Sequence, residues 1–374
     1  MKIRNIFLSG HLHFLLLALL IFIAPGMISA DEYVGALYYY YFARQPGARA
    51  EAMGRSGVAI SGDAFSCLYN PALISGNSGL CLSASYASPY YILEDAKYSF
   101  IGLTYTSQGY GGFGLCRYNF DDGLSDYATD ENGNIIGEAG SSESMYTLTY
   151  SYPVLSDFNI GINLSYYYHR LPTALFVGEE NEANVTAKAF PIDLGLLKTF
   201  TFGSAENTSQ RLTLGASLFN ISNTKINYDD QADPLPQVFH LGIAYRLLIN
   251  ELSFLNLKQF QWLLQVEYQD VFNSRYYTGF KFGTEFSVYE ILFIRLGYYT
   301  ETHNDYGLSD VNKSVVDDFT YGFGLALPIK TIFNFPLIEN IKFDMLSLEQ
   351  PGYTNTTDDW GTYSLYNLTI NFNL

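Results

Sequence analysis

The last nine residues, 366–374, alternate between apolar and polar side chains up to the C-terminus. Apolar residues stand at Tyr366, Leu368, Ile370, Phe372 and Leu374, and Asn or Thr fills the positions between them. Neighbouring residues of a β-strand face opposite sides, so this strand has one apolar and one polar face. The same alternation recurs in about a dozen segments of the chain. So many half-apolar strands need either a large protein core or lipid to cover them.

The N-terminus carries the pattern of a secretion signal. Lys2 and Arg4 precede an apolar run over 12–24, and Ile28-Ser29-Ala30 is a cleavage site that predicts a mature start at Asp31. An uncleaved anchor is the alternative, but the apolar run is short for a membrane span. No later stretch is long and apolar enough to cross a membrane as a helix. Half-apolar strands of an exported protein therefore predict a β-barrel.

Aromatic residues support this interpretation. They make up 17% of the chain, with 33 Tyr and 28 Phe, whereas charged residues are only 15%. Amphipathic rings are stable at the headgroup level, where barrels carry aromatic girdles. Tyrosine clusters fall near predicted strand ends: Tyr90-Tyr91, Tyr166-Tyr167-Tyr168, Tyr276-Tyr277 and Tyr298-Tyr299. A soluble β-sandwich also pairs aromatic residues, but together with the signal they favour an all-β transmembrane antiparallel β-barrel in the outer membrane of a diderm bacterium.

Charge and cysteine content exclude several classes of protein. The formal net charge is −17, and loss of Lys2 and Arg4 with the signal takes it to −19. Nucleic acid is an unfavourable partner for so acidic a chain. Cys67, Cys81 and Cys116 lack metal-ligand spacing, and an odd number cannot pair fully within one chain. We expect them to be small packing residues, with a Cys67–Cys81 disulfide as the alternative in an oxidising periplasm.

The period-two pattern predicts fourteen strands. We expect them at 79–87, 98–106, 111–119, 143–153, 157–168, 186–202, 211–221, 237–249, 259–270, 275–287, 290–302, 317–328, 339–347 and 361–374. Most reach the roughly 9–11 residues that a tilted strand needs to cross a bilayer. The predicted organisation is a signal peptide over 1–30, an N-terminal hatch or plug segment over 31–78, and the barrel over 79–374.

The lengths of the connections predict an orientation. If both termini are periplasmic, the connections after odd strands face outside, where outer-membrane barrels carry their long loops. The four longest candidates have this parity: 120–142, 169–185, 222–236 and 303–316. The acidic run 130–134 in the first of them lacks the glycine and terminal glutamate of an EF-hand. Its Asn132-Gly133 pair is typical of a tight turn, which we prefer to a calcium site.

Charged residues fall on the predicted lumen face of several strands. Those with neighbours of opposite sign are Arg246, Glu267, Lys281, Glu285 and Arg295. We expect Arg246 beside Glu267, then Lys281 and Glu285, then Arg295. Opposite charges on adjacent strands stabilise a wall, so structural pairing is preferred to a polar conduction path.

A barrel of about fourteen strands is too wide for its wall side chains to fill. The segment before the first strand is the candidate to occupy it, because its centre is rich in Gly and Ala, which allow close backbone approach. A periplasmic helix or loose tail is the alternative. The predicted hatch residues are Met53, Gly54, Gly57, Asp63, Asn70, Pro71 and Ala72.

These stretches resemble a known family. Ala52-Met53-Gly54-Arg55-Ser56-Gly57-Val58-Ala59, Asp63-Ala64 and Asn70-Pro71-Ala72-Leu73 are similar to the N-terminal hatch of FadL-like outer-membrane proteins, a group that includes PorV and PorQ of the type IX secretion system. Leu214-Gly215-Ala216, Phe219-Asn220-Ile221-Ser222-Asn223, Gly283-Thr284-Glu285-Phe286 and Ile294-Arg295-Leu296-Gly297-Tyr298 resemble the PorV/PorQ branch. Two departures are Arg55, where the hatch often has a small residue, and the terminal Leu374, where an aromatic residue is usual.

The resemblance implies a fourteen-stranded barrel with a plug and two competing functions. The PorV/PorQ-type function, which we expect first, is protein secretion and surface export, with secreted cargo proteins and other secretion components as partners. The alternative is a FadL-like passive channel for hydrophobic small molecules, gated by the hatch. Outer-membrane lipid is expected in both cases, with no cofactor or metal. No enzyme is expected, because His303 near Asp305 is the only suggestive pair and no motif places a nucleophile.

Overall fold

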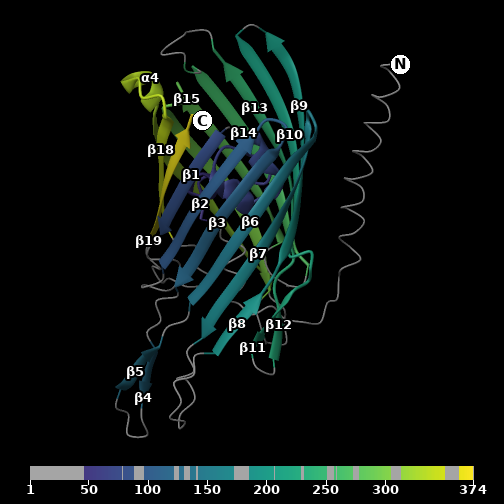
Figure 1. The fold of residues 1–374 in the computed structure, drawn as a ribbon, viewed down its shortest axis with the longest axis vertical. Helices are drawn as coiled ribbons and strands as arrows, with labels where there is room; N and C mark the ends of the chain where they lie inside the picture. The colour runs from purple at the N-terminus through teal and green to yellow at the C-terminus, as the bar shows by residue number, and fades with distance from the viewer. Residues whose placement is uncertain are drawn as a thin grey trace, which may run out of the picture.

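The chain folds into a barrel of tilted strands (Figure 1). The computed structural model describes residues 46–77, 79–87, 97–121, 126–129, 135–139, 142–171, 185–205, 207–228, 231–250, 257, 259–272, 278–304, 313–349 and 362–373. Fourteen strands build the barrel wall: β1 (Gly79–Ala87), β2 (Lys97–Ser107), β3 (Gly111–Asp121), β6 (Ser142–Leu155), β7 (Phe158–Leu171), β9 (Ile192–Ala205), β10 (Thr208–Phe219), β13 (Val238–Ile249), β14 (Phe260–Val271), β15 (Thr278–Val288), β16 (Leu292–Asn304), β17 (Lys313–Leu327), β18 (Ile338–Glu349) and β19 (Thr362–Phe372).

The wall is closed and antiparallel. Each strand pairs with its neighbour in the chain, and the ring closes where β1 pairs with β19, from Leu80 opposite Phe372 to Ala87 opposite Leu365. All fourteen predicted strands are present, so the predicted fold class is confirmed. Closure leaves no free outer edge between the first and last strands, as a lipid-embedded sheet requires.

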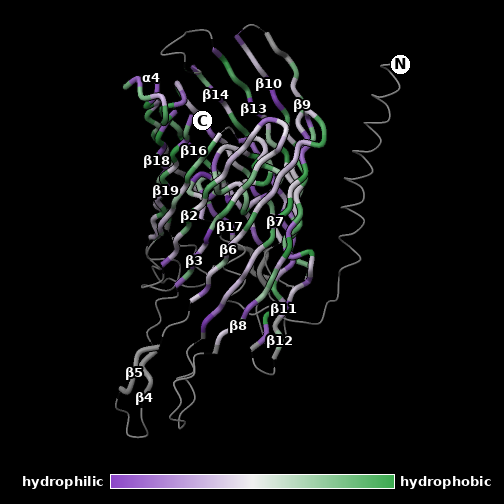
Figure 2. The backbone as a smooth tube through the Cα atoms, in the orientation of Figure 1, coloured by the Kyte–Doolittle hydropathy of each residue, from purple (hydrophilic) through white to green (hydrophobic). Residues whose placement is uncertain are grey.

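The outer face of the wall is apolar. Along β2 and β3 the side chains alternate between buried and exposed, and the exposed positions include Ile101, Leu103, Phe113 and Leu115. Figure 2 shows hydrophobic and hydrophilic residues alternating along the barrel strands. A closed barrel with an apolar outer face is an outer-membrane protein. The protein is therefore located in a bacterial outer membrane.

In the part of the chain that the structure describes, no helix has the length and hydrophobicity to cross a membrane.

The tyrosine clusters do not all lie at strand ends. Tyr298 and Tyr299 lie inside β16, where Tyr299 faces the lumen and is 1% exposed, so this part of the predicted aromatic girdle is wrong. Tyr167 of β7 also faces inward and is fully buried. Alternation places one member of every adjacent pair inside the barrel. The clusters at 90–91 and 276–277 lie outside the described residues.

Several short elements were not predicted. Two hairpins, β4 (Asp126–Thr129) with β5 (Ile135–Ala139) and β11 (Lys225–Tyr228) with β12 (Gln231–Pro234), stand in predicted loops. Strand β8 (Val185–Ala189), in contrast, belongs to the predicted strand 186–202. It continues β9 alongside β7, with a break at Pro191, which lacks the N–H for a ladder hydrogen bond. The helix α4 (Ile329–Phe333) lies between β17 and β18. The acidic run 130–134 lies outside the described residues, between β4 and β5.

The two ends of the barrel differ. One end, at the top of Figure 1, carries α4 and the tight turns β6–β7 and β9–β10; we call it the short-turn end. The other end carries the β4–β5 and β11–β12 hairpins and is called the long-loop end. The predicted orientation makes the short-turn end periplasmic and the long-loop end extracellular.

Residues 46–77, which we call the inner segment, lie within the ring of strands (Figure 1). This segment contains α3 (Ala48–Glu51) and the short 3₁₀ helices η2 (Ala64–Leu68) and η3 (Pro71–Gly76). Most of its side chains are buried, including the polar Arg55, Ser56 and Asn70. The predicted signal peptide over 1–30 and the residues up to 45 lie outside the described part of the chain.

Candidate lumen site of the inner segment

Paired glycines in the wall make room for the backbone of the inner segment. Each pair lies directly across two adjacent strands: Gly161 and Gly195, Gly215 and Gly242, and Gly283 and Gly297. A Cβ atom on Gly297 would overlap the backbone nitrogen of Gly54, and one on Gly283 would overlap Met53. Only glycine allows such close backbone approach. Gly215, Gly283 and Gly297 belong to the stretches that carried the family resemblance, but their contact with the inner segment was not predicted.

The first anchor joins Arg49 of α3 to Glu285 of β15. The guanidinium binds both carboxylate oxygens, with Nε–Oε2 at 2.9 Å and Nη2–Oε1 at 2.6 Å. Glu285 also accepts a hydrogen bond from Arg295 Nε at 2.6 Å, and Arg295 Nη1 lies 2.8 Å from Asp344 Oδ1. Burial alone would lower the pKa of Arg49, but Glu285 raises it above its ordinary value. Bidentate buried pairs of this kind fix orientation as well as position.

The second anchor joins the turn after α3 to Glu267 of β14. Glu267 Oε2 accepts hydrogen bonds from the backbone nitrogens of Gly57 at 2.8 Å and Val58 at 3.0 Å. Its other oxygen lies 2.8 Å from Nδ1 of His240. Glu267 is fully buried, so its hydrogen-bonding capacity is directed to the inner segment and adjacent wall residues. A fully buried carboxylate requires such partners.

The third anchor involves Arg55, at a position where the hatch sequences that this stretch resembles often have a small residue. Its guanidinium donates to Glu301 Oε2 at 3.1 Å and to the Tyr299 hydroxyl at 2.9 Å, and it lies 3.6 Å from the centre of the Tyr299 ring. Arg55 has a φ of +62°, which is uncommon outside glycine. A large residue is tolerated here because β16 supplies its counter-charge and a ring to stack on.

The C-terminal part of the inner segment is held without charges. Asn70 caps η3 by accepting from Ala72 N at 3.0 Å, and its amide donates to the carbonyl oxygens of Val58 at 3.0 Å and Leu196 at 2.9 Å. Pro71 occupies the first position of η3, where a missing N–H is harmless. The predicted Asn70-Pro71-Ala72 stretch therefore connects the segment to itself and to β9.

Hydroxyl and amide side chains of the wall complete this attachment. They donate to backbone carbonyl oxygens of the segment: Asn163 to Cys67 at 2.9 Å, Ser217 to Tyr69 at 2.8 Å, Ser151 to Ala72 at 3.1 Å and Thr106 to Ile74 at 2.8 Å. None of these groups titrates near neutral pH. Asp63, which directly precedes η2, is half-buried. Burial raises the pKa of its carboxyl group, and the opposing effect of the nearby Arg49 and Lys342 does not cancel this.

The predicted lumen charges face inward, but one predicted pairing is wrong. Glu267 stands opposite Lys281, and Glu285 stands opposite Arg295, as expected. Arg246 stands opposite Leu263 and Arg211, whereas Glu267 stands opposite Gly242. The register of β13 against β14 sets Arg246 four residues away from the position facing Glu267. Arg211 and Arg246 share a small cavity of about 70 Å³ and make no hydrogen bond or ion pair with other described residues.

The three cysteines are buried and free in the structure, as expected of small packing residues, and the alternative Cys67–Cys81 disulfide is not formed. Cys67 Sγ lies 3.5 Å from Cys116 Sγ on β3, not beside Cys81. Cys81 Sγ lies 3.7 Å from the Ser83 hydroxyl. Cys116 lies on β3 and faces the inner segment, and its contact with Cys67 was not predicted from the sequence.

The wall is incompletely paired between β17 and β18. Strand β17 pairs with β16 from Leu292–Leu325 to Asn304–Lys313, but with β18 only from Phe323–Met345 to Leu327–Ile341. The β17 residues 313–322 and the β18 residues 346–349, between which the structure has no β17–β18 ladder pair, are called the wall gap, and they lie toward the long-loop end. A cavity of about 570 Å³ at the gap is lined by Ile294, Arg295, Leu296, Tyr321, Gly322, Phe323, Met345, Leu346, Ser347 and Thr362.

The wall gap reaches from the lipid face to the inner segment. Tyr321, Phe323 and Met345 are exposed on the outer face, whereas Leu346 is buried on the inner face. At Gly322 a Cβ would overlap the Cβ of Ala52. The inner segment therefore lies directly behind the gap.

The described residues hold no metal cluster, and they include only one member of the suggested His303–Asp305 pair. Among those residues, no group of three or more His, Cys, Asp or Glu side chains is placed to hold a metal ion. His303 lies in β16 rather than in the predicted loop, because that strand extends to Asn304. Asp305 lies outside the described residues.

The chain is similar to several solved structures. The toluene transporter TodX of Pseudomonas putida is 13% identical over 87% of this chain and 96% of its own, with a TM-score of 0.41. The toluene transporter TbuX of Ralstonia pickettii is 13% identical over 87% and 97%, with a TM-score of 0.39. A Pseudomonas aeruginosa FadL homologue is 9% identical over 92% and 100%, with a TM-score of 0.42. No family model and no curated protein matches the sequence, so the PorV/PorQ assignment stays a prediction.

Proposed function

We propose that this protein is an outer-membrane channel for hydrophobic small molecules, closed along its axis by the inner segment and open sideways at the wall gap. The wall gap is the observation that carries the proposal. Where two neighbouring strands diverge in lipid, they lose ladder hydrogen bonds to each other, which is costly. Such a gap is understandable where a solute passes through the wall.

The lining of the wall gap suits an apolar solute. Ile294, Leu296, Phe323 and Met345 offer apolar surface, and the outward end of the gap meets lipid rather than water. The transfer of a hydrophobic molecule from water to such surroundings lowers its free energy. It needs no aqueous pore, so the filled lumen is compatible with transport.

A reversible bridge across the wall gap tests the lateral path. Continuing the β17–β18 register beyond Phe323 and Met345 would set Tyr321 opposite Ser347. The double variant Tyr321→Cys/Ser347→Cys, in a background whose native cysteines are replaced by Ser, should close the gap on oxidation. We expect uptake of radiolabelled toluene by cells producing this variant to fall to the level of cells lacking the protein, and reduction to restore it.

A matched bridge supplies the control. Tyr268 and Phe280 are opposite each other on the paired β14–β15 seam, away from the wall gap, and also face outward. The variant Tyr268→Cys/Phe280→Cys should cross-link without changing uptake. Wild-type cells that take up toluene no faster than cells lacking the protein would refute the channel, and unchanged uptake in the cross-linked Tyr321/Ser347 variant would refute the lateral path.

The hatch role is tested separately. Deletion of Asn70-Pro71-Ala72 removes the cap of η3 and its contact with β9, so it should loosen the inner segment and increase passive leakage of the same probe. Unchanged permeability in a folded barrel would contradict gating by the inner segment.

The type IX secretion role rests on the sequence resemblance alone. Deletion of the gene in the native host, followed by a survey of surface-exported proteins, distinguishes it from the channel. Loss of exported proteins would favour secretion, whereas unchanged export with impaired uptake would favour the channel.

A further inference from the structure

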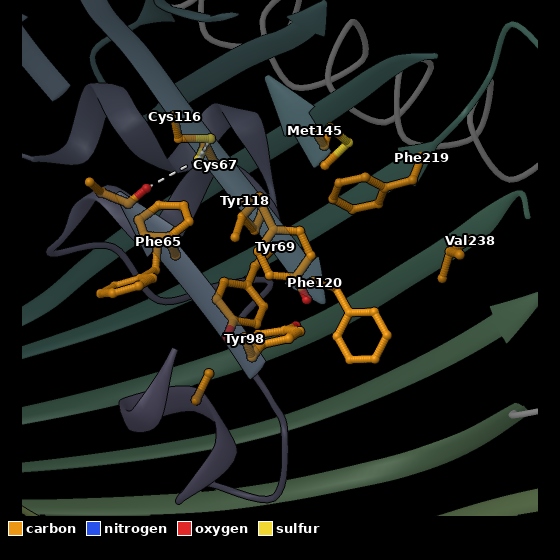
Figure 3. Packing of buried hydrophobic residues seen from close by; sticks show 14 of the residues in the cluster. Phe65, Cys67, Tyr69, Tyr98, Cys116, Tyr118, Phe120, Met145, Phe219 and Val238 are labelled. Atoms are coloured by element: carbon orange, nitrogen blue, oxygen red, sulfur yellow. Dashed lines mark hydrogen bonds between the residues drawn. The ribbon is translucent and has the colours of Figure 1, made fainter. Parts of the chain in front are cut away.

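Two cysteines from different parts of the fold meet inside the barrel. Cys67 belongs to η2 of the inner segment, and Cys116 belongs to β3 of the wall. Their sulfur atoms are 3.5 Å apart, and the side chains are 1% and 4% exposed. Figure 3 shows the two sulfurs adjacent within the cluster of buried hydrophobic residues. This is a contact between segment and wall, not between neighbours in the chain.

The surroundings hold Cys67 in this position. Its backbone carbonyl accepts from Asn163 of β7 at 2.9 Å, and its thiol donates to the Ala64 carbonyl at 3.1 Å. Phe65, two residues earlier, packs on Phe100 of β2 with ring centres 4.5 Å apart. Contacts on both sides of Cys67 therefore direct its sulfur toward Cys116.

We propose that Cys67 and Cys116 are oxidised to a disulfide that ties the inner segment to the barrel wall. In this step two S–H bonds break and one S–S bond forms. Two protons leave, and two electrons pass to the disulfide of an exported thiol oxidant, which becomes a dithiol through a mixed disulfide. Outer-membrane proteins cross a compartment where such oxidants act.

The structure places the oxidation before the segment reaches its final position. The hydrogen bond with Cys116 and burial raise the pKa of the Cys67 thiol well above its ordinary value, so the reactive thiolate is scarce in the assembled protein. Burial also denies access to a protein oxidant. Once formed, the bond would fix η2, and only the residues of the inner segment before η2 could then move.

Peptide mapping of the full-length protein tests the proposal. Protein purified from outer membranes is denatured without reductant, alkylated with one reagent, reduced, and alkylated with a second. We expect the first label on Cys81 and the second on Cys67 and Cys116, which should also appear as one linked peptide before reduction. The proposal is overturned if Cys67 and Cys116 carry the first label even in protein assembled in the presence of glutathione disulfide, or if Cys67 is linked to Cys81.

Matched variants test the consequence for the segment. In oxidised protein, amide exchange over 64–68 should be about tenfold slower than in Cys116→Ser. Cys81→Ser, which removes a buried thiol without a sulfur neighbour among the described residues, should match the wild type. A heat-modifiable band confirms that each variant has formed its barrel. Equal exchange in Cys116→Ser and an oxidised wild type would show that the bond does not hold the segment, and would overturn the tether.

Discussion

The two parts of the inner segment are held by different chemistry. Residues 49–58 are attached to β14, β15 and β16 by carboxylates, chiefly Glu267, Glu285 and Glu301. Residues 64–75 are attached to β2, β6, β7, β9 and β10 by hydroxyl, amide and carbonyl groups. One part therefore depends on charge, and the other does not.

This difference predicts how each part of the inner segment responds to substitution. Removing one member of a buried ion pair leaves an uncompensated charge and is strongly destabilising. Removing a neutral hydrogen bond costs less, because the group left behind is easier to rehydrate or repack. We therefore expect the charged part to respond sharply to substitution, and the neutral part to lose its contacts gradually.

The largest effect is expected from Glu285→Ala. It leaves Arg49 and Arg295 buried without their shared carboxylate and should lower the free energy of unfolding by about 3–5 kcal/mol. Urea titration in detergent measures the change, and hydrogen exchange should show greater opening over 48–58 than over 64–76. The exposed Glu339→Ala is the control and should stay within about 0.5 kcal/mol of the wild type. Equal loosening of both parts would contradict the division.

Asn70→Ala tests the neutral part. It removes the cap of η3 and two contacts with carbonyl groups, so we expect a loss of about 2 kcal/mol. Hydrogen exchange should increase first over 70–76. Asn207→Ala, at an exposed turn, should leave both parts unchanged. The division would be wrong if Asn70→Ala opened 48–58 more than 70–76.

A smaller effect is expected at Asp63, where the two parts meet. Its raised pKa means that the folded protein binds this proton more tightly than the unfolded chain does. Stability should therefore fall as pH rises from the ordinary carboxyl value of 3.8 through the raised value, and remain reduced above it. Asp63→Asn should remove this dependence and slow exchange over 62–68 at neutral pH. The measurement is exchange at several pH values; a wild type that gained protection as pH rose would contradict the sign.

The smallest effect is expected at the arginine pair on the wall. Arg211 and Arg246 are like charges directly opposite each other, an arrangement that is destabilising. Arg246→Gln should raise the free energy of unfolding by about 0.2–1 kcal/mol, and the gain should shrink at high salt. Arg117→Gln on the exposed face is the comparison, and it should give no salt-dependent gain. A loss of stability in Arg246→Gln would indicate that this cavity holds a partner for the charge.

The strands could be predicted because lipid imposes the period-two pattern locally. Strand β1 was predicted with its observed ends, since apolar residues must alternate whatever the strand pairs with. The division of the inner segment could not be predicted. Arg55 and Glu301 are 246 residues apart, and Cys67 and Cys116 are 49 apart, so no local pattern joins them.

Register and irregular pairing also escaped prediction. The neighbour of Arg246 depends on how β13 aligns with β14, which a sequence pattern leaves open by several residues. The wall gap depends on where β17 and β18 diverge, and both strands look regular in sequence. The hairpins β4–β5 and β11–β12 were missed because four- and five-residue strands give too short an alternation to detect.

The seam between β1 and β19 has a consequence for biogenesis. The inner segment ends just before β1, and β1 completes the ring only by joining the final strand. While the β1–β19 seam is still open, the incomplete barrel can thus close around the inner segment. The segment then need not be threaded through the opening of a completed barrel. Insertion into the membrane and filling of the interior would then be one concerted event.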